Sequence, residues 1–309
     1  MNYRYLLVAP LLVAVFSGCS PKVTNKYALL SYQVNPFNIK KEHTDEGHEQ
    51  LSDNSTLVVP SVYDFKTKPT NNINSFALII GIKNYKQNSS VEYADVSALA
   101  FRTLAHKTFG IPKENIITLL NSDASSGQIK AKLALIKELS EKDGNIYLYF
   151  AGHGVPGKDG ATYLLPNDMS ADAIHLESNL KLDTIYDDLA GSAAKNVFVF
   201  MDSCFSGKDD EGSLLYKGVA PVLKTKKVDL KSKKLTVFTA GKSTDFANDH
   251  KEKQQRLFSY HLIKELSSGE TNLHHVYKKI QKMVKRQSLM KGLGYKQIQM
   301  YGNSNKLLH

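Results

Sequence analysis

The sequence contains no tryptophan and only two cysteines, Cys19 and Cys204. Two cysteines cannot build the disulfide framework that small secreted domains use. The net charge is +10, but Lys and Arg are scattered, and no basic module interleaved with aromatic residues occurs. The sequence therefore predicts no nucleic-acid partner. No internal repeats are evident.

The N-terminal segment, residues 1–19, has the form of a targeting signal. Arg4 precedes the apolar run Leu6–Phe16, which is too short to span a membrane as a stable helix, and Ser17-Gly18-Cys19 ends it. The segment resembles a bacterial lipoprotein signal, in which Cys19 is acylated and anchors the protein. Ser20 resembles an outer-membrane sorting residue, so the resemblance implies the bacterial cell envelope, at the outer membrane facing the periplasm. An ordinary secretory signal cleaved near Gly18 is the alternative.

The remaining chain divides into a polar segment and an alternating segment. Residues 20–74 carry no periodic stretch long enough for a core, so we expect a tether with at most one accessory strand. From residue 75 to 309, apolar strand patterns alternate with helical spacings. This alternation predicts an α/β domain with a mainly parallel central sheet and helices on both faces.

Two of the predicted strands end in residues with reactive side chains. Asn145–Gly154 reads NIYLYFAGHG and delivers His153; Asn196–Gly207 reads NVFVFMDSCFSG and delivers Cys204. A free cysteine is often a buried hydrophobe and a lone histidine is more often structural. Neighbouring parallel strands, however, would bring both side chains to one edge of the sheet, as a cysteine nucleophile and its proton-transfer partner require. If Cys19 is acylated, Cys204 is the only thiol in the mature chain.

These two motifs resemble the signature strands of caspase-like cysteine peptidases, most closely the metacaspase and bacterial branches. Weaker similarities extend over about the last three quarters of the chain, from Phe76–Tyr85 to Gln297–Gly302. The resemblance implies a caspase-like three-layer sandwich and a Cys204–His153 dyad that hydrolyses peptide bonds. It also implies oxyanion donors at the backbone N–H groups of Gly154 and Cys204.

Substrate preference is implied by acids at positions that match the metacaspase pocket. Asp95 and Asp202 occupy these positions, which implies cleavage after Lys or Arg. Ala240 and Gly241, after the strand that follows the nucleophile, are assigned to substrate binding by the same resemblance. The alternatives are that Asp95 complements a helix dipole and that Asp202 is a turn residue.

The segment after the nucleophile suggests regulation. Residues 208–234 begin with Lys208 and carry seven further lysines: Lys217, Lys224, Lys226, Lys227, Lys231, Lys233 and Lys234. An enzyme that prefers basic residues could process itself there, although a solvated charged loop also explains the composition.

Four acids loosely resemble those that bind calcium in some metacaspases: Asp168, Asp183, Asp209 and Asp210. Solvated surface acids are the alternative. No cofactor is expected to be required.

Three functions remain open on the sequence. A cysteine endopeptidase acting on protein or peptide substrates is the main prediction. A catalytically silent scaffold that binds a partner at the membrane is the alternative from another class, because Ala151 and Phe205 depart from the commoner Ser and His. A Cys-His transpeptidase is the third, since the sequence does not distinguish acyl acceptors.

Overall fold

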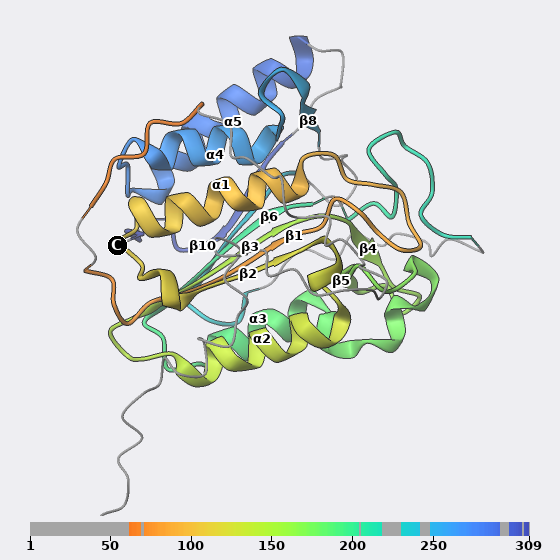
Figure 1. Cartoon of the computed structure of the whole chain (residues 1–309), viewed down its shortest axis with the longest axis horizontal. Helices are drawn as coiled ribbons and strands as arrows, with labels where there is room; N and C mark the ends of the chain where they lie inside the picture. The colour runs from red at the N-terminus through yellow and green to blue at the C-terminus, as the bar shows by residue number, and fades with distance from the viewer. Residues whose placement is uncertain are drawn as a thin grey trace, which may run out of the picture.

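A computed structural model describes residues 62–68, 71–203, 205–217, 230–241, 248–290, 297–304 and 306–308. Its centre is a six-stranded sheet with the order β10-β7-β6-β3-β1-β2 (Figure 1). The strands are β1 (Phe76–Gly81), β2 (Ile116–Leu120), β3 (Asn145–Ala151), β6 (Asn196–Asp202), β7 (Leu235–Thr239) and β10 (Gln299–Gly302). Every pairing is parallel except that of β10 with β7. The predicted mainly parallel sheet is confirmed.

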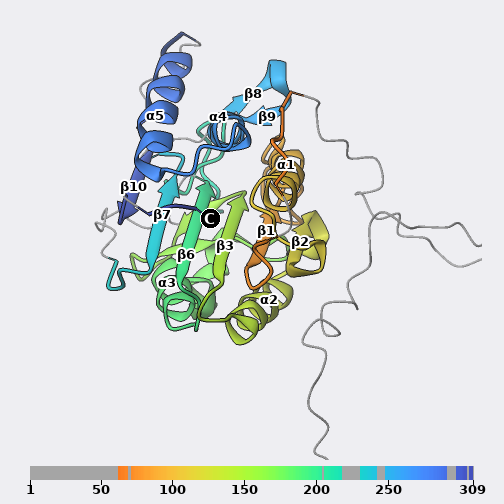
Figure 2. The same cartoon turned by 90° about the vertical axis from the view of Figure 1, so that its left-hand side faces the viewer.

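Helices cover both faces of the sheet (Figure 2). One face carries α1 (Ala94–Lys107), α4 (Leu257–Ser267) and α5 (Leu273–Met290). The other carries α2 (Ser126–Leu139) and α3 (Leu182–Ala190). The result is the three-layer sandwich that the alternating pattern predicts.

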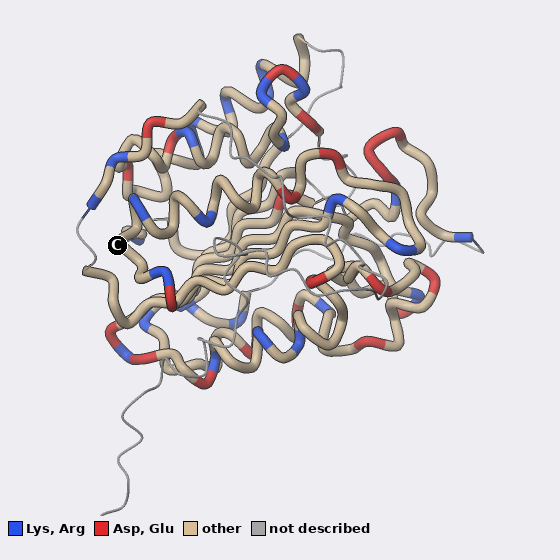
Figure 3. Tube along the Cα trace, in the orientation of Figure 1, with Lys and Arg blue, Asp and Glu red and all other residues tan. Residues whose placement is uncertain are grey.

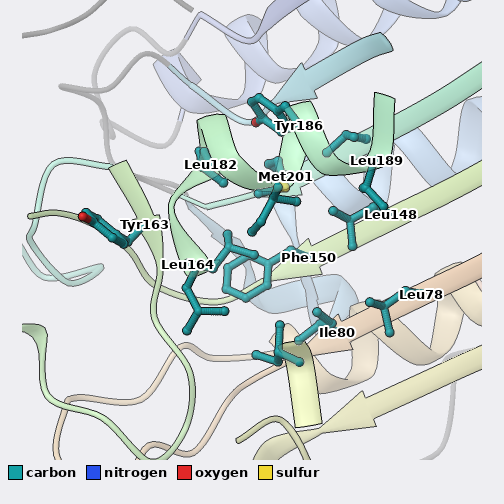
Figure 4. Close-up of a cluster of buried hydrophobic side chains, with 14 of the residues drawn as sticks. Leu78, Ile80, Leu148, Phe150, Tyr163, Leu164, Leu182, Tyr186, Leu189 and Met201 are labelled. Carbon is teal, nitrogen blue, oxygen red and sulfur yellow. The ribbon is translucent and has the colours of Figure 1, made fainter. Parts of the chain in front are cut away.

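The strand sequences explain this burial on both faces. Every residue of β1 and β3 is buried, as expected for parallel strands covered on both sides. Successive side chains alternate, so Leu78 and Ile80 of β1 pack toward α2 and α3, whereas Ile79 packs toward α1. Figure 4 shows the α3 side of the core, where Met201 of β6 lies between Phe150 of β3 and the side chains of Leu182 and Leu189 on α3.

Close packing of α1 on β1 depends on a glycine. A Cβ atom at Gly81, the last residue of β1, would lie 2.5 Å from the Cβ of Ala98 and 2.8 Å from the carbonyl oxygen of Ala94. The small residues let the N-terminal turn of α1 approach the end of the strand. This contact fixes the start of α1 beside the edge of the sheet where the His153 and Cys204 motifs end.

Short elements surround that edge. β4 (Gly154–Pro156) and β5 (Thr162–Leu164) form a hairpin directly after β3, and β8 (Asp249–His250) pairs with β9 (Gln255–Arg256) before α4. Short 3-10 turns occur at Lys113–Asn115, Asn121–Asp123, Ala171–Leu176, Ser178–Leu180 and Lys251–Lys253. The sequence pattern predicts an irregular region after His153 and misses the hairpin, because its strands have only three residues each. Within the described ranges no helix is long and apolar enough to cross a membrane.

Candidate active site

The site lies where β3 and β6 end side by side. The two strands are in register along their whole length, and their last residues, Ala151 and Asp202, are partners. The N–H of Gly152 then donates to the carbonyl oxygen of Asp202 at 3.4 Å. His153 follows Ala151 by two residues, and Cys204 follows Asp202 by two residues. Cys204 itself lies outside the described residues.

His153 is held by its backbone and by its ring. Its N–H donates to the phenol oxygen of Tyr85 at 2.7 Å, and the two rings lie 4.9 Å apart. The ring Nε2 lies 2.9 Å from the carbonyl oxygen of Ser89. Because a carbonyl only accepts, Nε2 carries the proton of the neutral imidazole, and Nδ1 is the ring atom left to accept one.

Burial sets the charge state of His153. Only 4% of the residue is exposed, and this desolvation lowers the pKa of the imidazole below its ordinary value. The Ser89 carbonyl and the carboxylate of Asp210 act in the opposite direction, whereas the guanidinium of Arg256 lowers the pKa further. The imidazole is therefore neutral at pH 7, the form that can take a proton from a thiol.

Asp202 is fully enclosed by groups of its own chain. Its exposed fraction is 0%, and Oδ2 accepts hydrogen bonds from the backbone N–H of Ser259 at 2.9 Å and from its hydroxyl at 2.6 Å. Oδ1 lies 3.6 Å from Nε of Arg256. Burial raises the pKa of Asp202, and the guanidinium and the Ser259 hydrogen bonds act against that rise.

Arg256 lies between two carboxylates. It is 1% exposed, and beyond Asp202 its two terminal nitrogens contact Asp210, with Nη2 at 3.2 Å from Oδ1 and Nη1 bonded to Oδ2. Asp210 stands on the loop that follows Cys204, and Figure 3 shows the acidic residues of this loop. The Arg256 N–H donates to the hydroxyl of Ser97 on α1 at 3.0 Å. The arginine thus joins β9, α1, the end of β6 and the loop.

Asp95 lies in the first turn of α1 and is also buried. Its Oδ1 accepts the N–H of Val96 at 2.8 Å, and its Oδ2 accepts from the amide of Asn121 at 3.4 Å. The Oδ1 of Asn121 in turn accepts the N–H groups of Lys83 and Asn84 at 2.9 and 3.0 Å. Asp95 therefore supports the β1–α1 loop, two residues before the serine that binds Arg256.

The other predicted substrate and oxyanion residues surround the same edge. Gly154 is buried at the start of β4, paired with Leu164 of β5. Ala240 follows β7, and its N–H donates to the carbonyl of Met201 in β6 at 2.9 Å. The carbonyl of Gly241 accepts from the Thr239 hydroxyl at 2.9 Å.

The four acids predicted for calcium do not form one cluster. Asp168 accepts the N–H of Ser126 at the start of α2 at 2.8 Å, and Asp183 lies in the first turn of α3. Asp209 accepts two backbone N–H groups of its own loop, and Asp210 binds Arg256. In the described part of the chain, no group of three or more His, Cys, Asp or Glu side chains could hold a metal ion.

Several sequence-predicted positions lie beyond the described residues. Besides Cys204, these are Cys19 with the whole signal, residues 20–61 of the predicted tether, and Lys224, Lys226 and Lys227. The described lysines of the 208–234 segment include Lys231, which pairs with Asp187 at 2.8 Å, and Lys234, which donates to the carbonyl of Ser192 at 3.0 Å.

Sequence reasoning missed Tyr85, Ser259 and Arg256 as parts of the site. Tyr85 is about seventy residues from His153 in the chain, and no local pattern connects them. Arg256 is also far along the chain from both carboxylates it contacts, and only the structure shows these contacts.

Comparison with known proteins gives a family and a fold. A family model described as Caspase domain matches residues 74–308. A crystal structure of a Geobacter sulfurreducens protein is 18% identical, with a TM-score of 0.53, and the match covers 74% of this chain and 94% of that one. The Drosophila initiator caspase Dronc is 12% identical with a TM-score of 0.49, covering 87% and 96%. Among curated proteins no match was found.

Proposed function

Because the chain belongs to the caspase-domain family, we propose that it is a cysteine endopeptidase with a Cys204–His153 dyad. The register of β3 and β6 carries this proposal. Ala151 and Asp202 are partners at the strand ends, and each reactive residue follows its strand by the same two positions. Adjacent strands lie about 4.8 Å apart, so this arrangement supports a short path between imidazole and thiol.

The proposed reaction uses His153 first as base and then as acid. Nδ1 takes the Cys204 thiol proton, and the thiolate sulfur attacks the peptide carbonyl carbon. The C–N bond breaks as the imidazolium gives its proton to the leaving amine, which leaves a thioester. Water, deprotonated by His153, then attacks the thioester and releases the carboxylic acid and the thiol. The contact with the Ser89 carbonyl supports this order of proton transfers, because it holds the His153 ring through Nε2 and leaves Nδ1 to accept the thiol proton.

The tetrahedral intermediate carries negative charge on its oxygen, and this charge needs hydrogen-bond donors close to the Cys204 thiol. We propose the backbone N–H groups of Gly154 and Cys204 for this role. The glycine at 154 begins β4 directly after His153, so its position in the chain suits the role.

The proposed substrates are proteins or peptides cleaved after Lys or Arg, with Asp95 and Asp202 supplying the negative charge and Ala240 and Gly241 lining the substrate side. A silent scaffold is less well supported, because both dyad residues are present. The acyl acceptor is proposed to be water, and a transpeptidase would differ only at that step.

Peptide cleavage tests the proposal. Fluorogenic peptides ending in Arg or Asp are offered to the wild type, to Cys204→Ala and to His153→Ala, each with and without calcium. Release from the Arg peptides that is lost in both variants is the expected result. Equal release of the fluorophore by wild type and Cys204→Ala would reject the proposed peptidase activity. So would the absence of release from both the Arg and the Asp peptides by a folded protein.

Two further proposals concern the N-terminal signal and the loop of residues 208–234. We propose that Cys19 is acylated and anchors the protein to the outer membrane. Cys19→Ala should move the protein to the soluble envelope fraction, and unchanged membrane recovery would contradict this.

We also propose self-processing among the lysines of 208–234. Intact-mass measurement of active wild type should then show two fragments that Cys204→Ala lacks, and a single full-length mass in the wild type would contradict it.

A further inference from the structure

The carboxylate proposed to bind a basic substrate side chain already faces a guanidinium from its own chain. Asp202 Oδ1 lies 3.6 Å from Nε of Arg256, and the exposed fractions of the two side chains are 0% and 1%. The remaining oxygen of Asp202 is taken by both donors of Ser259. The charge of Asp202 is therefore already compensated, and a substrate guanidinium would have to displace Arg256 to reach it.

The outer side of Arg256 is closed by a second acid. Asp210 receives both terminal nitrogens of the guanidinium, a bidentate arrangement that fixes the plane of the group. The loop carrying Asp210 is itself ordered by local contacts, because Asp209 Oδ1 accepts the N–H groups of Glu211 and Ser213. Arg256 is thus held from two directions, with the end of β6 on one side and the post-nucleophile loop on the other.

This placement matters for charge selection. Asp202 and Asp210 alone would strongly attract a cation in a desolvated pocket, whereas Arg256 between them cancels one of their two negative charges. The cluster also lies close enough to the catalytic centre for both Asp210 and Arg256 to influence the His153 imidazole. Arg256 is therefore part of the electrostatic surroundings of the site.

We propose that Arg256 is a specificity-determining residue that competes with the substrate's Lys or Arg side chain for Asp202, and so weakens the enzyme's binding of basic substrates. The inference rests on the proposed peptidase function. The affinity of the enzyme for basic substrates should therefore be low while the Arg256 guanidinium is present. It should rise when that guanidinium is removed.

The test compares variants of the full-length chain in detergent. Arg256→Gln removes the charge and keeps much of the side-chain length, Arg256→Lys keeps the charge, and Arg286→Ala removes an exposed arginine of α5 as the control. For an Arg-terminated peptide, Arg256→Gln should raise kcat/KM about tenfold or more through a lower KM. Arg286→Ala should stay close to wild type, and Arg256→Lys, which keeps the charge but loses the bidentate contact, should lie between wild type and Arg256→Gln. A folded Arg256→Gln with an unchanged or higher KM would overturn the proposal.

A binding measurement separates this inference from catalysis. Agmatine, a guanidinium on a short aliphatic chain, is titrated calorimetrically into Cys204→Ala and into Cys204→Ala/Arg256→Gln. The double variant should bind at least about tenfold more tightly; equal affinity would overturn the inference even if no peptide is cleaved. If Arg256→Gln does not fold, Asp210→Asn takes its place: it removes the second carboxylate from Arg256, so it should weaken agmatine binding to Cys204→Ala, and unchanged or tighter binding would overturn the inference.

Discussion

The phenol oxygen of Tyr85 accepts the backbone N–H of His153 at 2.7 Å, and the Tyr85 ring packs against the imidazole at a centroid distance of 4.9 Å. One residue from the loop after β1 therefore positions the proposed base at the end of β3. Burial raises the pKa of Tyr85, which keeps the phenol protonated. This contact contributes to the packing of the fold, and it also fixes the position of the proposed base.

Tyr85→Phe tests this contact. The variant keeps the ring but leaves a buried N–H without its acceptor, which should lower the free energy of unfolding by about 1–3 kcal/mol. We also expect a lower kcat/KM, because the His153 loop loses its fixed position. Urea unfolding and peptide cleavage measure the two effects. Tyr301→Phe, on the edge strand β10, is the control, and equal losses in both variants would contradict the assignment.

Gly152→Ala tests the close approach of the same loop. A Cβ atom there would lie 2.6 Å from the phenol oxygen of Tyr85 and 3.0 Å from Cζ of Phe150. We expect a loss of about 1–3 kcal/mol in unfolding free energy from overpacking, with a fall in activity.

Gly127→Ala is the matched control for that substitution. Gly127 lies in the first turn of α2, and a Cβ atom added there would meet no other atom within 4 Å. The same chemical change should stabilise the protein by about 0.4–1 kcal/mol and leave activity unchanged. Destabilisation by both substitutions, or by neither, would show that the packing around Gly152 is not as described.

The pH dependence of kcat/KM should report the lowered pKa of His153. Burial disfavours the imidazolium, so the base form persists below pH 6.5 and the acid limb of the profile should fall below that value. Asp210→Asn removes a carboxylate that favours the imidazolium, and should move the limb to still lower pH. Asp188→Asn, an exposed acid on α3 that pairs with Lys137, should leave it in place. A limb that moves upward in Asp210→Asn would contradict the stated surroundings of His153.

Calcium removal tests the acids outside the dyad. Asp210 is engaged by Arg256 and Asp168 by the start of α2, so EDTA should leave peptide cleavage unchanged. Loss of activity in EDTA that calcium restores would instead support the sequence-based calcium site, which would then have to include groups beyond the described residues.

The sequence alone predicts the strands and the layers of the fold, because strands buried on both faces appear as continuous apolar runs. Ile146 to Phe150 and Val197 to Met201 are continuous apolar runs, and they become the adjacent parallel strands β3 and β6. The helical spacing of Ile129, Leu133, Ile136 and Leu139 likewise predicts a helix over 126–139, which is where α2 lies. Local composition carries this kind of information directly.

The surroundings of Asp202 could not be predicted in the same way. Its position two residues before Cys204 indicates a substrate-binding acid by resemblance, but its contacts come from Ser259 and Arg256, more than fifty residues later. A pairing of that kind depends on how α4 docks against the sheet. No local spacing in the sequence specifies it, and this is why the guanidinium beside the predicted acid was found only in the structure.

The most direct test of the account is covalent trapping of the thiol. The full chain carrying Cys19→Ala has one cysteine, Cys204, and is treated at pH 7 with an Arg-acyloxymethyl ketone, which alkylates activated thiolates. A working Cys204–His153 dyad should give one adduct per chain on the peptide containing Cys204, formed much more slowly when His153→Ala is added. An intact mass without adduct, or an equal rate in the His153→Ala variant, would contradict a working Cys204–His153 dyad.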